Sequence, residues 1–253
     1  TLPALVRARR HVLRGKASKS RARDPHFVKA ALTRWLVSYR GIFRRKSARQ
    51  ISVAGYKAMK LMQKWWAIPE LKIVSEFFDN PGYIDAFVEK ARQYKIEDFD
   101  HVIFSYHGLP MRQLTKIHPE LECADCNCDK GYKPEHRLCY HNECYETTRL
   151  ISKKLGLKES DYMDSFQSRL GKTPWWPPYS DQIVEEQAKS GAKKLLMYSP
   201  AVIADCLETS VEIEIEYQEI FEAHGGEKVQ LVESLNDSDI WVKTVAEMIA
   251  SRM

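Results

Sequence analysis

The sequence has no long hydrophobic run and no recognisable leader. None of its apolar stretches approaches the roughly 20 residues that a membrane-spanning helix requires. The first residues also lack the pattern of a signal peptide, so we expect a cytoplasmic protein whose cysteines are not paired in disulfides. Internal repeats are absent as well. The chain has 253 residues, of which 44% are hydrophobic and 29% are charged, and this composition is ordinary for a globular chain with its own core.

Acidic side chains are almost missing from residues 1–50. This stretch holds eleven Arg, four Lys and a single acid, Asp24, which gives a net charge of +14. Because the whole chain carries +5, the remaining 203 residues carry −9. A basic arm of this kind can bind anionic lipid or nucleic acid, and an Arg-rich, acid-poor start also resembles an organelle targeting segment.

Beyond the arm, predicted strands alternate with predicted helices. Short segments predict strands at 71–77, 102–106, 162–167, 195–199 and 229–235, and those at 102–106 and 195–199 are apolar runs. Amphipathic periodicity and capping residues predict helices at 52–66, 81–93, 144–155, 181–190 and 237–251, and a long helix that ends before Gly225. Residues 108–142 are polar and show no clear period. Alternating strands and helices indicate an α/β fold with a parallel sheet covered on both faces.

Two motifs place chemistry at strand ends. Residues 104–110 read F-S-Y-H-G-L-P, so that His107 stands where an apolar run meets a loop. Residues 204–209 read A-D-C-L-E-T and bring Glu208 shortly after another apolar run. Because the carboxyl ends of strands in open α/β sheets are where ligands bind, His107 and Glu208 form a plausible proton-handling pair.

Three further motifs complete an ordered set. They read D-N-P-G-Y-I at 79–84, F-Q-S-R-L-G at 166–171 and L-N-D-S at 235–238. Together the five motifs resemble those of the ferrochelatase family, whose members insert ferrous iron into a porphyrin. The resemblance runs from Ile51 to Met253 and divides the chain into an unmatched arm, 1–50, and a ferrochelatase-like α/β region, 51–253.

The resemblance implies a fold of two similar, doubly wound parallel α/β halves around a cleft. The carboxyl-terminal half is matched throughout, whereas the amino-terminal half is truncated or replaced by residues 1–50. We therefore favour an artefactual or degenerate origin for this stretch over a genuine basic arm or a targeting segment. The implied function is iron insertion into protoporphyrin IX or coproporphyrin III in haem biosynthesis, with Fe²⁺ and the porphyrin as substrates.

The resemblance assigns His107 as proton acceptor, as ligand of the substrate iron, or as both. Two pyrrole protons must leave the porphyrin, and a neutral imidazole is suited to accept one. Glu208, Glu212 and Glu216 share one face of a regular helix at their i, i+4, i+8 spacing, which suits a metal or proton route. The alternatives are a solvated acidic face and, because 211–216 alternates as V-E-I-E-I-E, a strand.

Porphyrin contacts are expected beside these groups. Gln167, Ser168 and Arg169 end a strand toward the same cleft, and an arginine can bind a propionate. Trp175 and Trp176, set among prolines, offer flat apolar surface to a macrocycle, and Trp176 is the predicted contact. The alternatives are a surface salt bridge for the arginine and core packing for the tryptophans.

The cysteines suggest a resident metal centre. Five of the six fall within 22 residues, whereas Cys206 belongs to the second motif and is expected to be buried and inert. Some ferrochelatases carry a [2Fe–2S] cluster in an insertion at about this place, and four thiolates would hold it. Zinc, with His136 or His141 as a further ligand, and no metal at all remain open. The candidate ligands are Cys123, Cys126, Cys128, Cys139 and Cys144.

Other functions remain as alternatives to iron insertion. The chain could be a catalytically inactive ferrochelatase fragment, or a metal-binding module whose working part is the Cys-rich loop. A binder of nucleic acid or of a membrane surface through residues 1–50 is a third class. We expect peripheral membrane contact at most, and no nucleic-acid partner.

Overall fold

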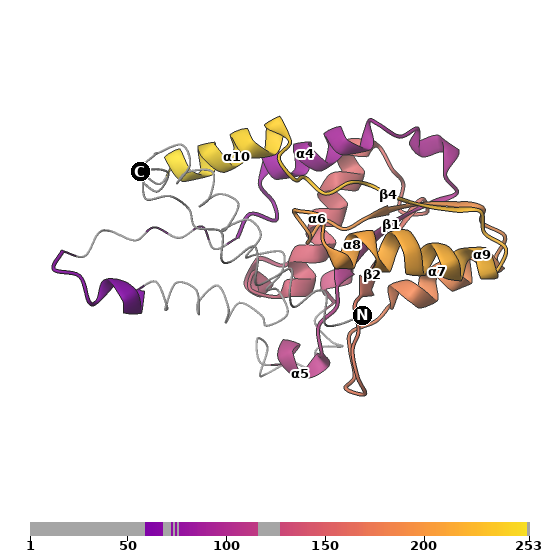
Figure 1. Cartoon of the computed structure of the whole chain (residues 1–253), viewed down its shortest axis with the longest axis horizontal. Coiled ribbons are helices and arrows are strands. Elements are labelled where there is room, and N and C mark those ends of the chain that lie inside the picture. Colours follow the sequence, from indigo (N-terminus) through magenta and orange to yellow (C-terminus); the bar gives the residue numbers. More distant parts are fainter. Residues whose placement is uncertain (1–58, 68–71, 73, 75, 116–126, 252–253) are drawn as a thin grey trace, which may run out of the picture. The chain divides into compact units, whose positions relative to one another are not determined.

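The computed structural model describes residues 59–67, 72, 74, 76–115 and 127–251 (Figure 1). All of them belong to one compact unit, Arg40–Met253. The predicted arm, residues 1–50, lies outside the described residues, as do Cys123 and Cys126.

Within the described residues, four strands form one parallel sheet in the order β2-β1-β3-β4. Their bounds are β1 His101–His107, β2 Tyr162–Gln167, β3 Lys194–Tyr198 and β4 Lys228–Leu231. The first three agree with the predicted strands, and β4 ends four residues before its predicted end. These strands form because short apolar runs can be buried on both faces of the sheet.

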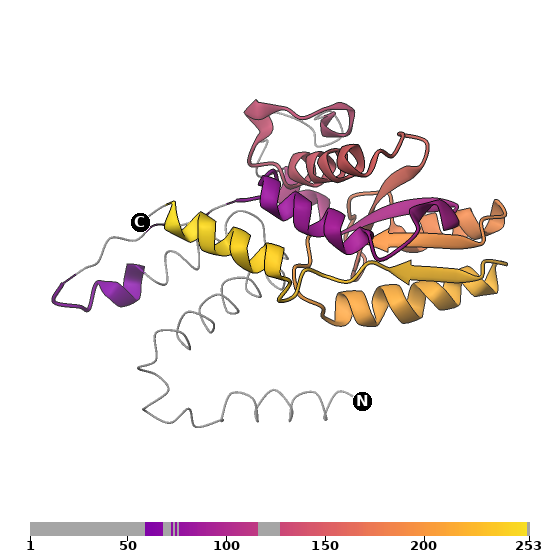
Figure 2. The same ribbon diagram turned by 90° about the horizontal axis from the view of Figure 1, so that it is seen from above.

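Helices cover both faces of the sheet (Figure 2). On one side lie α4 (Pro81–Ala91), α6 (Tyr140–Leu155) and α10 (Asp239–Ala250), with α4 packed between the other two. On the other side lie α7 (Ser180–Lys189) and α9 (Gln218–Ala223), which pack against each other. The α/β, doubly wound fold is therefore confirmed for this part of the chain.

The main core lies between the sheet and the pair α7 and α9. Ile103 of β1 and Met197 of β3 contribute from the sheet, and Val184 and Phe221 contribute from the helices. All four side chains are fully buried. On the opposite face, the ring of Phe104 stacks on Tyr198 with centroids 4.8 Å apart. Alternate residues of β1 thus serve two different cores, as the pleat of a strand requires.

Local signals explain where two helices begin and end. The Oδ1 of Asn80 accepts hydrogen bonds from the backbone N–H groups of Gly82 and Tyr83, at 3.0 and 3.3 Å, and Pro81 opens α4. Gly156 follows α6 with a positive φ of 73°, which a glycine adopts without steric cost. Both boundaries were predicted from the sequence.

Shorter helical segments occupy the connections. The polar stretch 108–142, predicted to have no clear period, contains three of them, and α6 begins at Tyr140, four residues before its predicted start. The segments among the described residues are η3 Ile96–Asp98, α5 Met111–Leu114, η5 Cys128–Lys130, η6 Pro134–His136, α8 Leu207–Ser210 and η7 Glu212–Tyr217.

Two predicted elements near the start of the described region are not formed as expected. The described part of the 52–66 helix ends at Met62, which is buried, whereas Leu61 and Trp65 are exposed. The described residues of the 71–77 stretch form no strand. An apolar run becomes a strand only where a neighbouring strand accepts its hydrogen bonds.

The long helix predicted after β3 is divided into α8, a π-helical segment η7, and α9. An i→i+5 hydrogen bond joins the N–H of Glu216 to the carbonyl of Val211 at 2.9 Å. The alternation at 211–216 therefore does not produce a strand. Helical spacing buries Ile213 and Tyr217 in the main core and leaves Ile215 exposed, whereas a strand would place all three on one face.

Candidate active site at the carboxyl edge of the sheet

The carboxyl edge of the sheet brings together two of the predicted site residues. β1 ends at His107 and β2 ends at Gln167, and these two residues are direct partners in the parallel ladder. The chain leaves β1 toward β2 on one side, while β3 and β4 lie on the other. This reversal makes the end of β1 a topological switch point, where open α/β sheets bind ligands.

His107 is buried, with 6% of its surface exposed. Its Nδ1 donates to the carbonyl of Gly108 at 2.7 Å, and its own carbonyl accepts from the Tyr140 hydroxyl at 2.8 Å. In a neutral imidazole that donates through Nδ1, the basic lone pair belongs to Nε2. The geometry is thus compatible with proton acceptance by Nε2.

The loop after His107 is fixed to the end of β2 and to the proline-rich loop. The N–H of Gly108 donates to the carbonyl of Gln167 at 2.8 Å, and a Cβ at position 108 would lie only 2.9 Å from that oxygen. Only glycine allows this approach. Further on, the N–H of Trp176 donates to the carbonyl of Leu109, and the N–H of Met111 to that of Pro174.

Glu212 is the most heavily bonded of the predicted carboxylates. It accepts from the N–H and the hydroxyl of Ser168, both at 2.5 Å, from the Tyr217 hydroxyl at 2.9 Å and from Nε2 of Gln167 at 3.3 Å. Burial, then the charge of Glu212 and the hydrogen bond to it, raise the pKa of Tyr217 well above its ordinary value. The phenol therefore stays protonated and donates to Glu212.

Glu208 is held through its main chain. Its carbonyl accepts from Nε2 of Gln167 at 2.7 Å. Burial raises the pKa of the neighbouring Cys206 thiol to about 11, and the hydrogen bond to Glu208 and its negative charge add to the effect. Cys206 therefore stays a thiol, and it is half-buried rather than fully buried as predicted.

Glu216 is exposed, whereas Glu208 and Glu212 are half-buried. The i→i+5 turn of η7 changes the spacing that places i, i+4 and i+8 on one face of a regular helix. Within the described residues, no group of three or more His, Cys, Asp or Glu side chains converges as a metal site would require. The roles of Glu208, Glu212 and Glu216 as iron ligands stay predictions.

Arg169 is engaged at the surface. Its Nη2 pairs with Oδ2 of Asp181 at 2.5 Å, and its guanidinium lies 4.3 Å from the ring centre of Tyr179. These contacts hold the loop after β2 to the start of α7. A propionate would have to compete with Asp181 for this arginine.

The two tryptophans lie in different surroundings. The ring of Trp175 is 6.4 Å from that of His107, whereas the ring of Trp176 is 4.3 Å from that of His141 in α6. Trp176, the predicted porphyrin contact, thus packs against a helix. Trp175 is the better placed of the two to meet a ligand beside His107.

Three of the five clustered cysteines lie within the described residues. Cys128, Cys139 and Cys144 are all buried and are not in disulfides. Cys128 Sγ lies 3.6 Å from Nδ1 of His136. Buried thiols suit iron or zinc chemically, and a set of four thiolates must also draw on Cys123 or Cys126.

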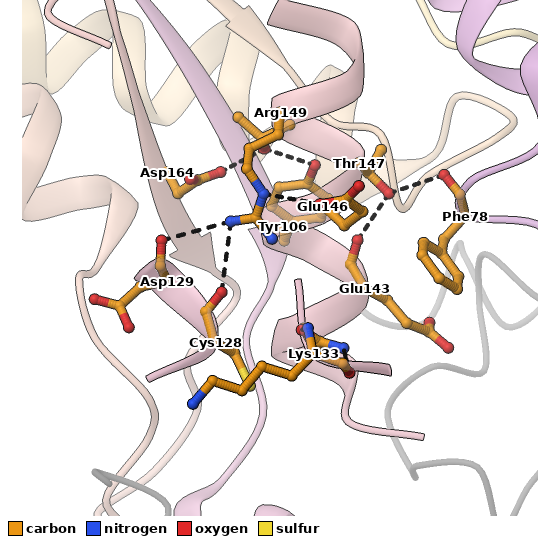
Figure 3. A network of polar contacts seen from close by, with 12 residues as sticks. Phe78, Tyr106, Cys128, Asp129, Lys133, Glu143, Glu146, Thr147, Arg149 and Asp164 are labelled. Carbon is orange, nitrogen blue, oxygen red and sulfur yellow. Dashed lines mark hydrogen bonds and ion pairs between the residues drawn. The ribbon is translucent and has the colours of Figure 1, made fainter. Parts of the chain in front are cut away.

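A polar network ties the Cys-rich segment to α6 and the sheet (Figure 3). Arg149 of α6 pairs with Glu146 at 2.8 Å and reaches the carbonyls of Cys128 and Asp129, both at 3.5 Å. One residue earlier, Thr148 donates to Asp164 of β2 at 2.5 Å.

Hydrogen bonds also join two of the predicted motifs. Asp205 and Asn236 form a reciprocal pair, in which Asp205 N–H donates to Asn236 Oδ1 at 3.0 Å and Asn236 Nδ2 donates to Asp205 Oδ2 at 2.7 Å. This pair fixes the loop that leads into α8 and Glu208. The sequence presented both motifs but not their contact.

Ser105 and Tyr217 contact the site and were not predicted. Ser105 donates to Gln167 Oε1 at 2.6 Å, and both residues are buried. Ser105 lies two residues before His107 in a strand that is buried on both faces. A buried polar side chain is costly unless it has a hydrogen-bond partner, so this serine could have been identified from the sequence as a site residue. Tyr217 gave no comparable signal, because a buried tyrosine on a helix is usually part of the core.

No helix among the described residues is long and apolar enough to cross a membrane.

Comparison with known proteins agrees with the motifs. The profile of the family described as Ferrochelatase matches residues 47–253. A ferrochelatase of Pseudomonas putida (strain W619) is 41% identical over 187 residues, which cover 72% of this chain and 55% of the relative. A ferrochelatase of Legionella pneumophila (strain Lens) is 36% identical over 208 residues, covering 82% and 62%. The chain thus spans little more than half the length of these relatives. It belongs to the ferrochelatase family.

Proposed function

We propose that this protein inserts Fe²⁺ into a porphyrin, protoporphyrin IX or coproporphyrin III, in haem biosynthesis. The observation that carries the proposal is the position of His107 in a member of the ferrochelatase family. This histidine is buried at the switch point, and its ladder partner Gln167 contacts both Glu208 and Glu212.

In the proposed reaction, His107 accepts a pyrrole proton through Nε2 while Nδ1 stays bonded to Gly108. Glu208, whose carbonyl accepts a hydrogen bond from Gln167, acts as a carrier of protons or of the substrate iron. Glu212 and Glu216 are further carriers along the same helical segment. Ser168, Arg169 and the tryptophans are porphyrin contacts in this proposal, with Trp175 added to Trp176 because of its place beside His107.

The test measures porphyrin binding and then metallation, under anaerobic conditions, from the loss of porphyrin fluorescence. The matched control for His107→Ala is His224→Ala, since His224 is exposed. Metallation that His107→Ala removes and His224→Ala leaves intact would support the proposal. Porphyrin binding without metallation would favour the alternative of a catalytically inactive fragment. No porphyrin binding would contradict both and leave the metal-binding module.

We also propose that four of the five clustered cysteines hold a [2Fe–2S] cluster. The support is the thiol-rich donor set and the burial of Cys128, Cys139 and Cys144. When bound, the cluster would supply a one-electron redox centre and a cross-link between the loop and α6. Anaerobically purified protein should be coloured, and single Cys→Ser changes should bleach it at four positions. Cys206→Ser is the control and should keep the colour. Stoichiometric zinc without iron would favour the zinc alternative.

A cytoplasmic location and peripheral membrane contact complete the proposal. Trp65 and Trp66 support the contact, because 56% and 107% of their surfaces are exposed. Large apolar side chains at such exposure suit a lipid interface. Sedimentation with anionic vesicles should deplete the wild-type protein from solution and Trp66→Ser less so. Equal depletion of both would contradict a role for this tryptophan.

A further inference from the structure

Both N–H groups and the oxygen of the Gln167 amide are engaged inside the protein. Its Oε1 accepts from the Ser105 hydroxyl at 2.6 Å, and its Nε2 donates to the Glu208 carbonyl at 2.7 Å and to a Glu212 carboxylate oxygen at 3.3 Å. The side chain is 1% exposed. A substrate could accept a hydrogen bond from this amide only if one of the two Nε2 bonds were broken.

The surrounding groups fix the orientation of the amide. If the amide were turned over, its oxygen would face two acceptors, the carbonyl of Glu208 and the carboxylate of Glu212. Neither could donate to it. In the observed orientation the oxygen meets a donor, the hydroxyl of Ser105.

A buried chain of serine hydroxyls holds that donor in place. Ser105 Oγ lies 2.8 Å from Ser180 Oγ, which in turn lies 2.8 Å from Ser165 Oγ. All three side chains are fully buried. Ser180 opens α7, and Ser105 and Ser165 are partners in the ladder of β1 and β2. The orientation of the Gln167 amide is therefore set by three elements at once.

We propose that Gln167 is a positioning residue, which holds the turn bearing Glu208 and Glu212 at a fixed place relative to His107. The inference rests on the proposed function in that His107 and the glutamates are the groups that meet iron and protons. Gln167 itself touches no substrate. It acts through the Glu208 carbonyl and the Glu212 carboxylate, and its backbone is the ladder partner of His107.

The first measurement needs neither iron nor porphyrin. Native-state hydrogen exchange, followed by NMR on the metal-free chain, reports the bond from the Ser168 N–H to Glu212 Oε1. Gln167→Leu should speed exchange of the Ser168 amide and of the η7 amides by at least about tenfold, because Glu212 and the Glu208 carbonyl lose their shared donor. Amides of α4 should exchange as before. The matched control is Gln182→Leu, since Gln182 is exposed on α7.

The second measurement tests whether Gln167 acts through the glutamate. The probe is Co²⁺ without porphyrin. Binding at this site is defined as the part of the total Co²⁺ binding that His107→Ala abolishes. Gln167→Leu should weaken that portion about 10- to 100-fold, the range known for groups that orient metal ligands. In a background that carries both Glu208→Gln and Glu212→Gln the same change should cost less than about twofold, since neither carboxylate is left for Gln167 to position.

Ser105→Ala provides a milder variant if Gln167→Leu does not fold. It leaves the amide present but removes the donor that orients it, and it should produce the same pattern at smaller amplitude. Unchanged exchange at Ser168 and η7 in a folded variant would overturn the inference. An equal loss of Co²⁺ affinity with and without the Glu208 and Glu212 carboxylates would overturn it too. A wild-type chain with no His107-dependent Co²⁺ binding would instead count against the proposed function, and the exchange result would still decide the positioning role.

Discussion

Asp164 should make the stability of the fold depend on pH in a way that one substitution removes. This carboxyl lies in β2 and accepts from Thr148 Oγ1 at 2.5 Å, and Thr148 in turn lies 2.9 Å from the Tyr106 hydroxyl. Burial raises the pKa of Asp164 from 3.8 to about 7, against the opposing effects of the Thr148 hydrogen bond and the charge of Arg149. Asp164→Asn keeps the shape and removes the titration.

The sign follows from proton binding in the two states. The folded state keeps the Asp164 proton up to about pH 7, whereas the unfolded chain loses it near its ordinary pKa of 3.8. The favourable contribution is therefore complete below about pH 4 and is lost as the pH rises to about 7. The rise in pKa corresponds to about 4 kcal/mol over this whole window, of which about 2 to 3 kcal/mol falls between pH 5 and pH 8.

The assay is urea unfolding of the wild type and of Asp164→Asn at pH 5, 6, 7 and 8. Groups common to both proteins cancel in the difference between their unfolding free energies. From pH 5 to pH 8 the unfolding free energy of Asp164→Asn should increase relative to that of the wild type by about 2 to 3 kcal/mol. A lost or altered bond to Thr148 would add a constant offset, which does not change with pH.

Asp161→Asn is the matched control for this experiment. Hydrogen bonds from Lys158 and Ser160 lower the pKa of Asp161, so its titration is complete below pH 5 in both states. Its variant should therefore differ from the wild type by the same amount at every pH of the series. A pH-independent difference for Asp164→Asn as well would refute the argument that burial keeps this carboxyl protonated.

Three further outcomes are expected at the carboxyl edge of the sheet. His107→Ala should abolish the porphyrin metallation described above, and a rate within a few-fold of the wild type would remove His107 from the reaction. Glu208→Gln should also be severe, because it removes charge and basicity but keeps the shape, and normal metallation would rule Glu208 out as a carrier. Asn236→Ala should lower the free energy of unfolding by about 0.5 to 1.5 kcal/mol, measured in urea, because it removes two hydrogen bonds with Asp205. A loss below about 0.5 kcal/mol would mean that water replaces the amide.

The elements that the sequence predicted well are those whose signals are local. β1, β2 and β3 follow from short runs of strand-forming residues. The start of α4 follows from Asn80, and the end of α6 follows from Gly156. Each of these residues acts on backbone groups within a few positions of itself. The stretch 71–77 has a similar local signal but forms no strand in its described residues, since pairing depends on what lies beside a run and not on the run itself.

The row of glutamates shows a different limit. Its predicted geometry assumed 3.6 residues per turn, and an i→i+5 turn replaces that geometry between Val211 and Glu216. Ile213 and Tyr217 of this segment are buried in the main core, and that core is assembled from segments far apart in sequence. A spacing argument on one segment cannot anticipate such a change.

The motifs at 166–171, 204–209 and 235–238 are joined by hydrogen bonds around one turn. Gln167 bonds the Glu208 carbonyl from the β2 side, while Asn236 bonds Asp205, three residues before Glu208, from the loop after β4. The turn that carries Glu208 is therefore held from two sides, by segments about 40 residues before it and 30 residues after it. Neither Gln167 nor Asn236 needs to meet iron or porphyrin to matter for the reaction. Because a displacement of about 1 Å at a reacting group can cost about a hundredfold in rate, residues that only fix this turn are as necessary to the proposed reaction as those that take the proton.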